Sequence, residues 1–249
     1  MIRVILVALF MLIVFIVSLI MLPLEWLIGK ININVKDISS LRMVQAIFKV
    51  VLFISGTKIT IIGKENIPIG ESVLFVGNHR GNFDTVIAYS IMPNITGFIA
   101  KKEMNKVPII RVWMRYLYCL LLDRQNPKEG LKTILKGIEY LKNGKSIVIF
   151  PEGTRNDGDG VLKFHGGSFK LAEKSNCKII PMVQNNTENI LETHMPFIKR
   201  THTIIEFGKP IDVASMSKEE RRNLPDITYN IVKDIYEHNK CLINQSNAL

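Results

Sequence analysis

A chain of 249 residues, of which 47% are hydrophobic, can bury one sizeable core plus a terminal appendage and does not require separate domains. Its formal net charge of +10 implies an acidic partner. Nucleic acid is not the expected partner, because no recognised binding motif is present and the basic residues are not interleaved with stacking aromatics. Anionic lipid headgroups and phosphorylated substrates fit the charge better.

The amino terminus predicts attachment to the cell membrane. Residues 4–24 form an uninterrupted uncharged run, long enough to span a hydrocarbon core of ~30 Å and too long for a cleaved signal peptide. A second apolar stretch, residues 43–54, is too short to span and predicts an interfacial or buried helix. The basic residues around the first run favour a main domain that faces the cytoplasm, with Arg3 before it and Lys30, Lys36, Arg42 and Lys49 after it.

From residue 57 onward, apolar or alternating runs typical of strands are separated by helical patterns. We therefore divide the chain into membrane-associated helices at 1–56 and an α/β domain at 57–249, with a mixed, largely parallel sheet flanked by helices. The predicted strands are 57–62, 72–76, 96–100, 119–122, 146–150, 178–183 and 202–207.

Two helices of this domain are predicted most clearly. One begins at Asn126-Pro127, carries apolar residues at helical spacing, and ends at Asn143-Gly144. The last extends from about Ser217 to Asn239 and is polar enough for a packed surface element.

The segment after the second predicted strand carries a candidate catalytic pair, His79 and Asp84. A histidine can act as a base and a nearby carboxylate can orient it, provided that the two lie on a turn, because five helical steps would place them on different faces. Gly77, Gly81 and Asn82 favour a turn. The pair would then lie at the carboxyl end of a parallel strand, where open α/β sheets bind ligands. The alternative role for Asp84 is to cap the helix that follows it.

A second block, Glu152-Gly153-Thr154-Arg155, follows the predicted strand 146–150 and supplies candidate anion-binding groups. No serine or cysteine stands in a recognised nucleophile motif, so we expect the nucleophile to be a hydroxyl of the substrate. The cysteines have no paired spacing, which predicts reduced thiols and no zinc site, and the remaining histidines show no ligand spacing, so we expect no metal. The cysteines are Cys119, Cys177 and Cys241.

These blocks together resemble the glycerolipid acyltransferase family, most closely the bacterial 1-acyl-glycerol-3-phosphate (lysophosphatidate) acyltransferases. The first and third blocks of the family match residues 78–84 and 152–155, and a proline-containing strand block matches residues 179–183. The blocks occur in family order over about residues 60–210. The family's second block corresponds to Lys102, Met104, Arg111 and Arg124. Arg111 stands where the family usually has glycine, and Gly81 where a small hydroxyl residue is common.

The resemblance implies acyl transfer from acyl-CoA or an acyl carrier protein to the sn-2 hydroxyl of 1-acyl-glycerol-3-phosphate, with no other cofactor. It implies that His79 and Asp84 are catalytic, and that the 152–155 block binds the glycerol phosphate, assisted by Lys102 and Arg124. It also implies that the N-terminal helices can lie in one leaflet, so spanning and monotopic anchors both stay open. The alternatives are an acyltransferase for another lysophospholipid or glycerol-3-phosphate, and an inactive membrane-anchored binding protein of the same fold.

Overall fold

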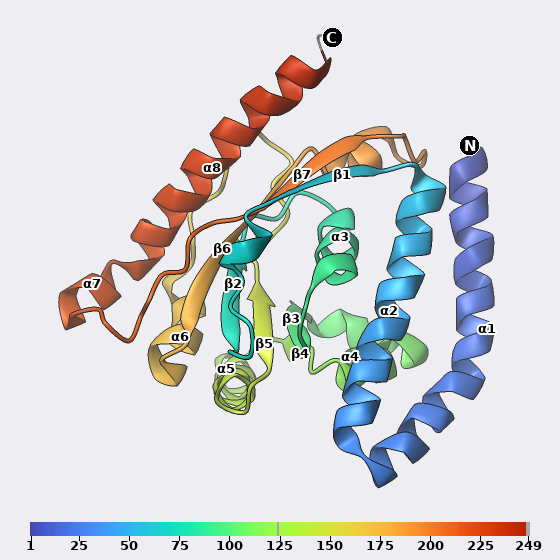
Figure 1. Ribbon diagram of the computed structural model, residues 1–249, viewed down its shortest axis with the longest axis horizontal. Coiled ribbons are helices and arrows are strands. Elements are labelled where there is room, and N and C mark those ends of the chain that lie inside the picture. Colours follow the sequence, from blue (N-terminus) through green and yellow to red (C-terminus); the bar gives the residue numbers. More distant parts are fainter. Residues whose placement is uncertain (124, 248–249) are drawn as a thin grey trace.

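The computed structural model describes residues 1–123 and 125–247. The chain begins with two long antiparallel helices, α1 (Ile2–Ile31) and α2 (Ile33–Ser55), which lie side by side at one edge of the molecule (Figure 1). The stretch predicted at 43–54 is therefore part of a longer helix. Asn32 separates the two helices, and its side chain accepts hydrogen bonds from the first backbone N–H groups of α2.

One sheet forms the centre of the rest of the chain, and all seven predicted strands belong to it. Among the described residues its strand order is β1-β7-β6-β2-β5-β3-β4. The β6–β7 pair is antiparallel and the other neighbours are parallel, which confirms the mixed, largely parallel sheet. The strands are β1 (Lys58–Ile62), β2 (Val73–Gly77), β3 (Thr96–Lys101), β4 (Leu120–Leu122), β5 (Ser146–Ile149), β6 (Lys178–Asn185) and β7 (His202–Phe207).

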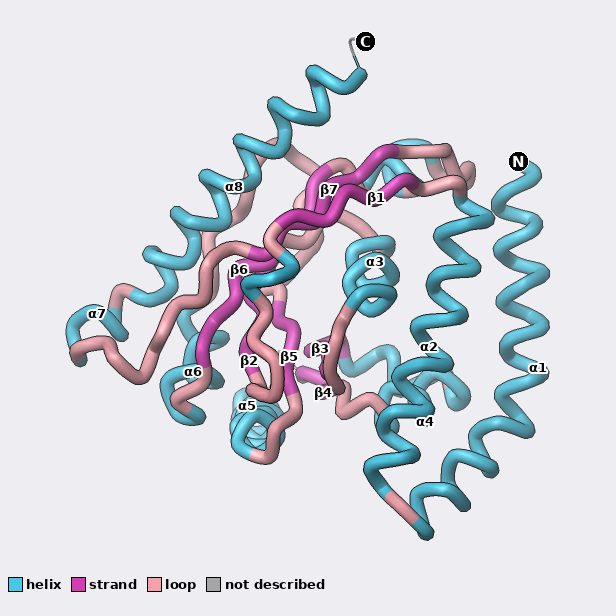
Figure 2. Tube along the Cα trace, viewed as in Figure 1, coloured by secondary structure: helices cyan, strands magenta, loops and turns pink. Residues whose placement is uncertain are grey.

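Helices cover both faces of this sheet, as the cyan and magenta segments of Figure 2 show. They are α3 (Phe83–Ile91), α4 (Pro108–Tyr116), α5 (Pro127–Lys142), α6 (Lys170–Ser175), α7 (Lys218–Arg222) and α8 (Leu224–Asn247). Short 3₁₀ turns lie in the connections between these elements, at Lys64–Asn66, Lys102–Lys106, Gly166–Phe169, Glu188–Ile190 and Glu192–His194.

The predicted helix starts and stops are partly correct. Asn126 caps α5 by accepting from the backbone N–H groups of Lys128 and Glu129, as its position before Pro127 predicted. The helix predicted over about 217–239 is instead two helices, α7 and α8. A helix interior excludes proline, so Pro225 stands in the first turn of α8, which then continues to Asn247.

Strand β2 divides the core into two layers because successive side chains point to opposite faces. Val73 and Phe75 pack with the buried residues of α2, α3 and α4. Leu74 and Val76 pack with those of α5, α6 and the start of α8. All four side chains are buried, as expected for a parallel strand covered on both faces.

Helix α2 packs against the sheet domain along its whole length. One face of it is buried from Lys36 in its first turn to Ser55 in its last. Gln45 Nε2 donates to the carbonyl oxygen of Met92 at 2.7 Å, and Asp37 accepts from Lys145 Nζ at 2.8 Å. The stretch predicted as interfacial or buried thus has its inner face against the protein.

Helix α1 makes fewer contacts with the rest of the protein than α2 does, and it exposes more apolar surface. Trp113 Nε1 in α4 donates to Ser18 Oγ at 3.0 Å, and Tyr116 OH donates to the carbonyl oxygen of Leu22 at 3.1 Å. By length and composition both α1 and α2 could cross a membrane, although over a third of the apolar window of α2 is buried in the protein. The exposed apolar side chains of α1 include Leu6, Leu9, Ile13, Ile16, Ile20 and Leu27.

Candidate active site

The catalytic candidates lie on a tight turn where β2 ends and α3 begins. Asn78, fully buried, fixes the start of this turn to β6: its side chain donates to the Gln184 carbonyl oxygen and accepts from the Gln184 backbone N–H, both at 2.8 Å. A glycine at position 77 is required, because an added Cβ would lie 2.5 Å from the carbonyl oxygen of Met182. These two contacts set the direction in which the chain leaves the sheet.

The turn brings His79 and Asp84 into direct contact, as predicted. His79 Nδ1 lies 2.7 Å from Asp84 Oδ2. The same carboxylate oxygen accepts the backbone N–H groups of Arg80 at 2.7 Å and Gly81 at 2.9 Å. The other oxygen accepts from the hydroxyl of Thr187. Asp84 is fully buried, and both of its carboxylate oxygens accept hydrogen bonds.

The capping role considered for Asp84 is wrong. Helix α3 begins at Phe83, so Asp84 lies inside its first turn, and the N-cap position is Asn82. The carboxylate turns back toward the residues before the helix instead of capping its free N–H groups. It therefore orients the turn and the imidazole together.

Further contacts hold both the ring and the backbone of His79. The ring of Phe150 stacks on it, with ring centroids 4.4 Å apart and an angle of 10° between the planes. The His79 backbone N–H donates to Glu152 Oε1 at 3.1 Å, and its carbonyl oxygen accepts from the Asn156 N–H at 2.8 Å. Glu152 and Asn156 thus fix the backbone position of His79 in the turn.

Glu152 is an unusual carboxyl group. It is only 4% exposed, and its Oε2 is buried without a hydrogen-bond partner. Burial raises the pKa of Glu152 to about 7, although the His79 and Leu162 N–H groups and the charge of Arg80 act in the opposite direction. Since Glu152 lies beneath the turn and does not line the cavity described below, its direct contact in the structure is with the His79 backbone.

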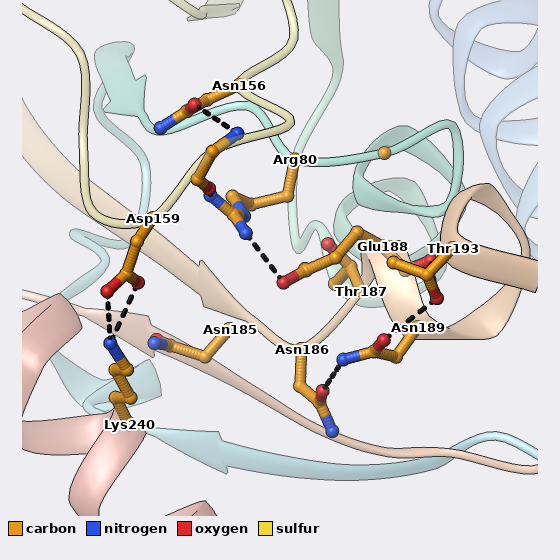
Figure 3. Close-up of polar contacts among 12 residues, drawn as sticks. Arg80, Asn156, Asp159, Asn185, Asn186, Thr187, Glu188, Asn189, Thr193 and Lys240 are labelled. Atoms are coloured by element: carbon orange, nitrogen blue, oxygen red, sulfur yellow. Dashed lines mark hydrogen bonds and ion pairs between the residues drawn. The ribbon is translucent and has the colours of Figure 1, made fainter.

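Arg80 connects the turn to the loop that follows the second motif (Figure 3). Its Nη2 lies 2.8 Å from Glu188 Oε1, and its Nη1 donates to the Gly158 carbonyl oxygen at 2.5 Å. The side chain is almost completely buried. Burial alone lowers the pKa of Arg80, but the hydrogen bond to Glu188 and the surrounding negative charges, Glu188 first, together outweigh burial, so the pKa is raised. Asn156 closes the same loop by donating to the Gly160 carbonyl oxygen at 2.9 Å.

A large, mostly apolar cavity of about 940 Å³ extends from His79 into the space between the helices. Its apolar walls include Met11 and Phe15 of α1, Phe48 of α2, and Trp113 of α4. Its polar end lies at the carboxyl ends of β2, β3 and β5, the usual place for a ligand in an open parallel sheet. The volume is within the range of ligand-binding cavities.

Three of the four residues of the 152–155 block line this cavity beside His79. Gly153 has a left-handed φ of 76°, which lets the chain turn sharply after Pro151. Thr154 and Arg155 follow it along the cavity edge. Arg155 keeps its side chain 48% exposed, so its guanidinium is available to an anion at the entrance.

The residues of the family's second block are less clearly placed in the site. Lys102 Nζ pairs with Asp123 Oδ2 at 2.9 Å, and it is the neighbouring Lys101 that lines the cavity. Arg124 lies outside the described residues. Arg111, at the position where the family usually has glycine, is an ordinary helical residue whose N–H donates to the Val107 carbonyl oxygen at 2.9 Å.

Several residues that support the site were not singled out from the sequence. Thr187 and Phe150 contact the two catalytic candidates directly, yet they come from segments far along the chain. Within residues 1–123 and 125–247, no group of three or more His, Cys, Asp or Glu side chains could hold a metal ion.

Comparisons with known proteins agree with this geometry. The family described as Acyltransferase matches residues 58–185. The 1-acyl-sn-glycerol-3-phosphate acyltransferase of Borreliella burgdorferi is 31% identical over 188 residues, covering 76% of this chain and 75% of that protein. The Escherichia coli enzyme with the same description is 32% identical, over 61% of this chain and 62% of its own length.

The fold also matches a solved structure. The crystal structure of the 1-acyl-sn-glycerophosphate acyltransferase from Thermotoga maritima has a TM-score of 0.74 and 23% sequence identity, covering 90% of this chain and 97% of that one. At this identity the match establishes the arrangement of the elements. The resemblance predicted from the four sequence blocks is thereby confirmed at the level of sequence family and fold.

Proposed function

Because this chain belongs to the family of 1-acyl-sn-glycerol-3-phosphate acyltransferases, we propose that it transfers an acyl group from a thioester to the sn-2 hydroxyl of lysophosphatidate, giving phosphatidate. The observation that carries this proposal is a His79–Asp84 pair at one end of an apolar cavity whose edge also carries Arg155. The apolar cavity suits an acyl chain, the His79–Asp84 pair suits a reacting hydroxyl, and Arg155 suits a phosphate.

His79 acts as the general base. With its Nδ1 proton donated to Asp84, the Nε2 atom is free to take the proton of the acceptor hydroxyl. The acceptor oxygen attacks the thioester carbonyl carbon, the C–S bond breaks, and the proton passes from His79 to the departing thiolate. Asp84 stabilises the imidazolium formed between these steps, while Phe150 and Glu152 keep the ring and its backbone in place.

The 152–155 block recognises the acceptor. Arg155 binds the glycerol phosphate through its planar guanidinium, which can engage phosphate oxygens bidentately. Gly153 and Thr154 shape the cavity edge next to it, and Glu152 contributes by supporting His79 from below. We also propose that Lys102 and Arg124 contribute positive charge to acceptor binding.

The apolar part of the cavity accepts the acyl chain. Its walls come from α1, α2 and α4, whose side chains exclude water from the thioester end. The donor is an acyl thioester of CoA or of an acyl carrier protein, and no further cofactor is required. Rates measured with both donors, at equal chain length, distinguish them.

We further propose that α1 and α2 form a monotopic anchor in one leaflet. The domain packs against α2 from its first turn to its last, so a spanning α2 would draw the catalytic domain into the hydrocarbon. The outer face of α1 is apolar and exposed, as an embedded helix requires. The catalytic domain faces the cytoplasm, in keeping with the free thiols of Cys119, Cys177 and Cys241.

The test is an acyl-transfer assay with purified protein in detergent. Wild type should acylate lysophosphatidate, and His79→Ala should lose activity by the ~10²- to 10⁴-fold typical of a general base while keeping its fold. Asp84→Asn should be severely impaired as well. Wild-type rates in a folded His79→Ala variant would refute the mechanism.

Acceptor identity is tested with Arg155→Ala. A charge-assisted contact is worth ~1.5–3 kcal/mol, so the variant should lose most of the preference for lysophosphatidate over a phosphate-free monoacylglycerol. An equal proportional loss for both acceptors would instead indicate a structural role or a donor contact. Rates with other lysophospholipids and with glycerol-3-phosphate decide between the acceptor classes.

A further inference from the structure

Gly81 leaves a space in the catalytic turn that a residue from a distant loop fills. A Cβ added at Gly81 would lie 2.6 Å from Oε2 and 3.0 Å from Cδ of Glu192. Glu192 begins the short turn Glu192–His194, which follows β6 and the Thr187 that holds Asp84. The missing side chain at position 81 is therefore what admits the Glu192 carboxylate.

The Glu192 carboxylate is held firmly against the turn. Its Oε1 accepts the Asn82 backbone N–H at 2.6 Å, at the start of α3, where the Asn82 side chain makes no capping bond. A carboxylate at this end of a helix is also favoured by the helix dipole. The Glu192 side chain is 18% exposed, and its Oε2 is buried without a hydrogen-bond partner.

The same carboxylate reaches the second motif. Arg155 Nη1 lies 3.6 Å from Glu192 Oε1. A guanidinium has five N–H donors, so Arg155 can face Glu192 with one edge and still present donors to an anion at the cavity edge. Glu192 is thus in contact with both the catalytic turn and the proposed phosphate ligand.

We propose that Glu192 is a positioning residue for the acceptor, which sets where Arg155 presents its guanidinium relative to His79. The proposal rests on the proposed function, in which Arg155 binds the acceptor phosphate. A long, half-exposed arginine loses side-chain entropy when it binds, and a fixed carboxylate beside it reduces that cost in advance. Glu192 stays in place during this step because its Oε1 accepts the Asn82 N–H and its Oε2 is buried against Gly81.

The experiment is a double-mutant cycle on the full-length protein in detergent, with Glu192→Gln, Arg155→Ala and both together. Glutamine keeps the shape and an acceptor for the Asn82 N–H, so only the charge is removed. A partly exposed ion pair is worth ~0.2–1 kcal/mol, so we expect KM for lysophosphatidate to rise about 1.4- to fivefold. The effect should appear in KM and not in kcat, should be absent with monoacylglycerol, and should vanish in the Arg155→Ala background.

Gly81→Ser gives an independent test, since its Cβ would displace Glu192. It should reproduce the rise in KM, and Glu192→Ala should add nothing to it. Equal effects on both acceptors, additive effects with Arg155→Ala, or a lower KM in Glu192→Gln would overturn the proposal. A wild type that shows no preference for the phosphorylated acceptor would instead overturn the proposed function, so the two failures are distinguishable.

Discussion

The pH dependence of stability should change when Glu152 is replaced by glutamine. The Glu152 carboxyl is buried under the turn that carries His79, where burial raises its pKa from the ordinary value of 4.5 to about 7. The folded protein therefore binds this proton more tightly than the unfolded chain does. Its contribution to stability is complete below pH 4.5 and is lost as the pH rises through about 7.

The size of the effect follows from the same values. A pKa difference of one corresponds to about 1.36 kcal/mol, so the rise from 4.5 to about 7 corresponds to roughly 3 kcal/mol. Glutamine keeps an oxygen for the His79 N–H and carries no charge at any pH. Relative to wild type, Glu152→Gln should therefore gain roughly 3 kcal/mol between pH 4.5 and 7.5, or about 6–12 °C in unfolding temperature for a chain of this size.

The assay is thermal unfolding of both proteins in detergent, followed by circular dichroism at several pH values from 4.5 to 8.5. Only the difference between the curves matters, because a constant offset between glutamine and protonated glutamate cancels. Glu65→Gln, at an exposed position, is the matched control and should leave the pH dependence unchanged. Curves for wild type and Glu152→Gln that stay parallel over this range would refute the argument.

Three further changes test other parts of the structure. Thr187→Val should lower kcat with little change in KM, measured by steady-state kinetics, because it removes a hydrogen bond to the charged Asp84 that is worth ~1.5–3 kcal/mol. Gly97→Ala should lower the unfolding temperature measured by scanning calorimetry, because its Cβ would lie 2.2 Å from the Tyr118 carbonyl oxygen, and such overpacking costs ~1–3 kcal/mol or more. Deletion of residues 1–28 should weaken but not abolish cosedimentation with anionic vesicles, since apolar side chains on the outer face of α2 remain.

The sequence predicts the sheet well because its signals are local. Central parallel strands are buried on both faces and appear as short apolar runs, and the turn after β2 follows from its glycine and asparagine residues. The helix predicted over 217–239 is two helices because a proline is accommodated only in the first turn of a helix, so Pro225 marks the start of α8.

The candidate site is only partly predictable for a different reason. The contact between His79 and Asp84 spans five residues, whereas Thr187 reaches Asp84 from 103 residues away. No local sequence pattern indicates a contact between residues so far apart. Lysines 101 and 102 differ by a single step along the end of β3, which decides which of them faces the cavity.

Helix α1 both carries exposed apolar surface and lines the cavity, which limits how this helix can be exchanged. Met11 and Phe15 belong to the helix with the most exposed apolar surface and also line the space that leads to His79. The anchor is therefore not an exchangeable part. Replacing α1 with an unrelated membrane helix would restore the location of the protein and leave one side of its cavity open. On the proposed function, substitutions in α1 are constrained on its inner face by substrate and on its outer face by lipid, so the two faces should tolerate different residues.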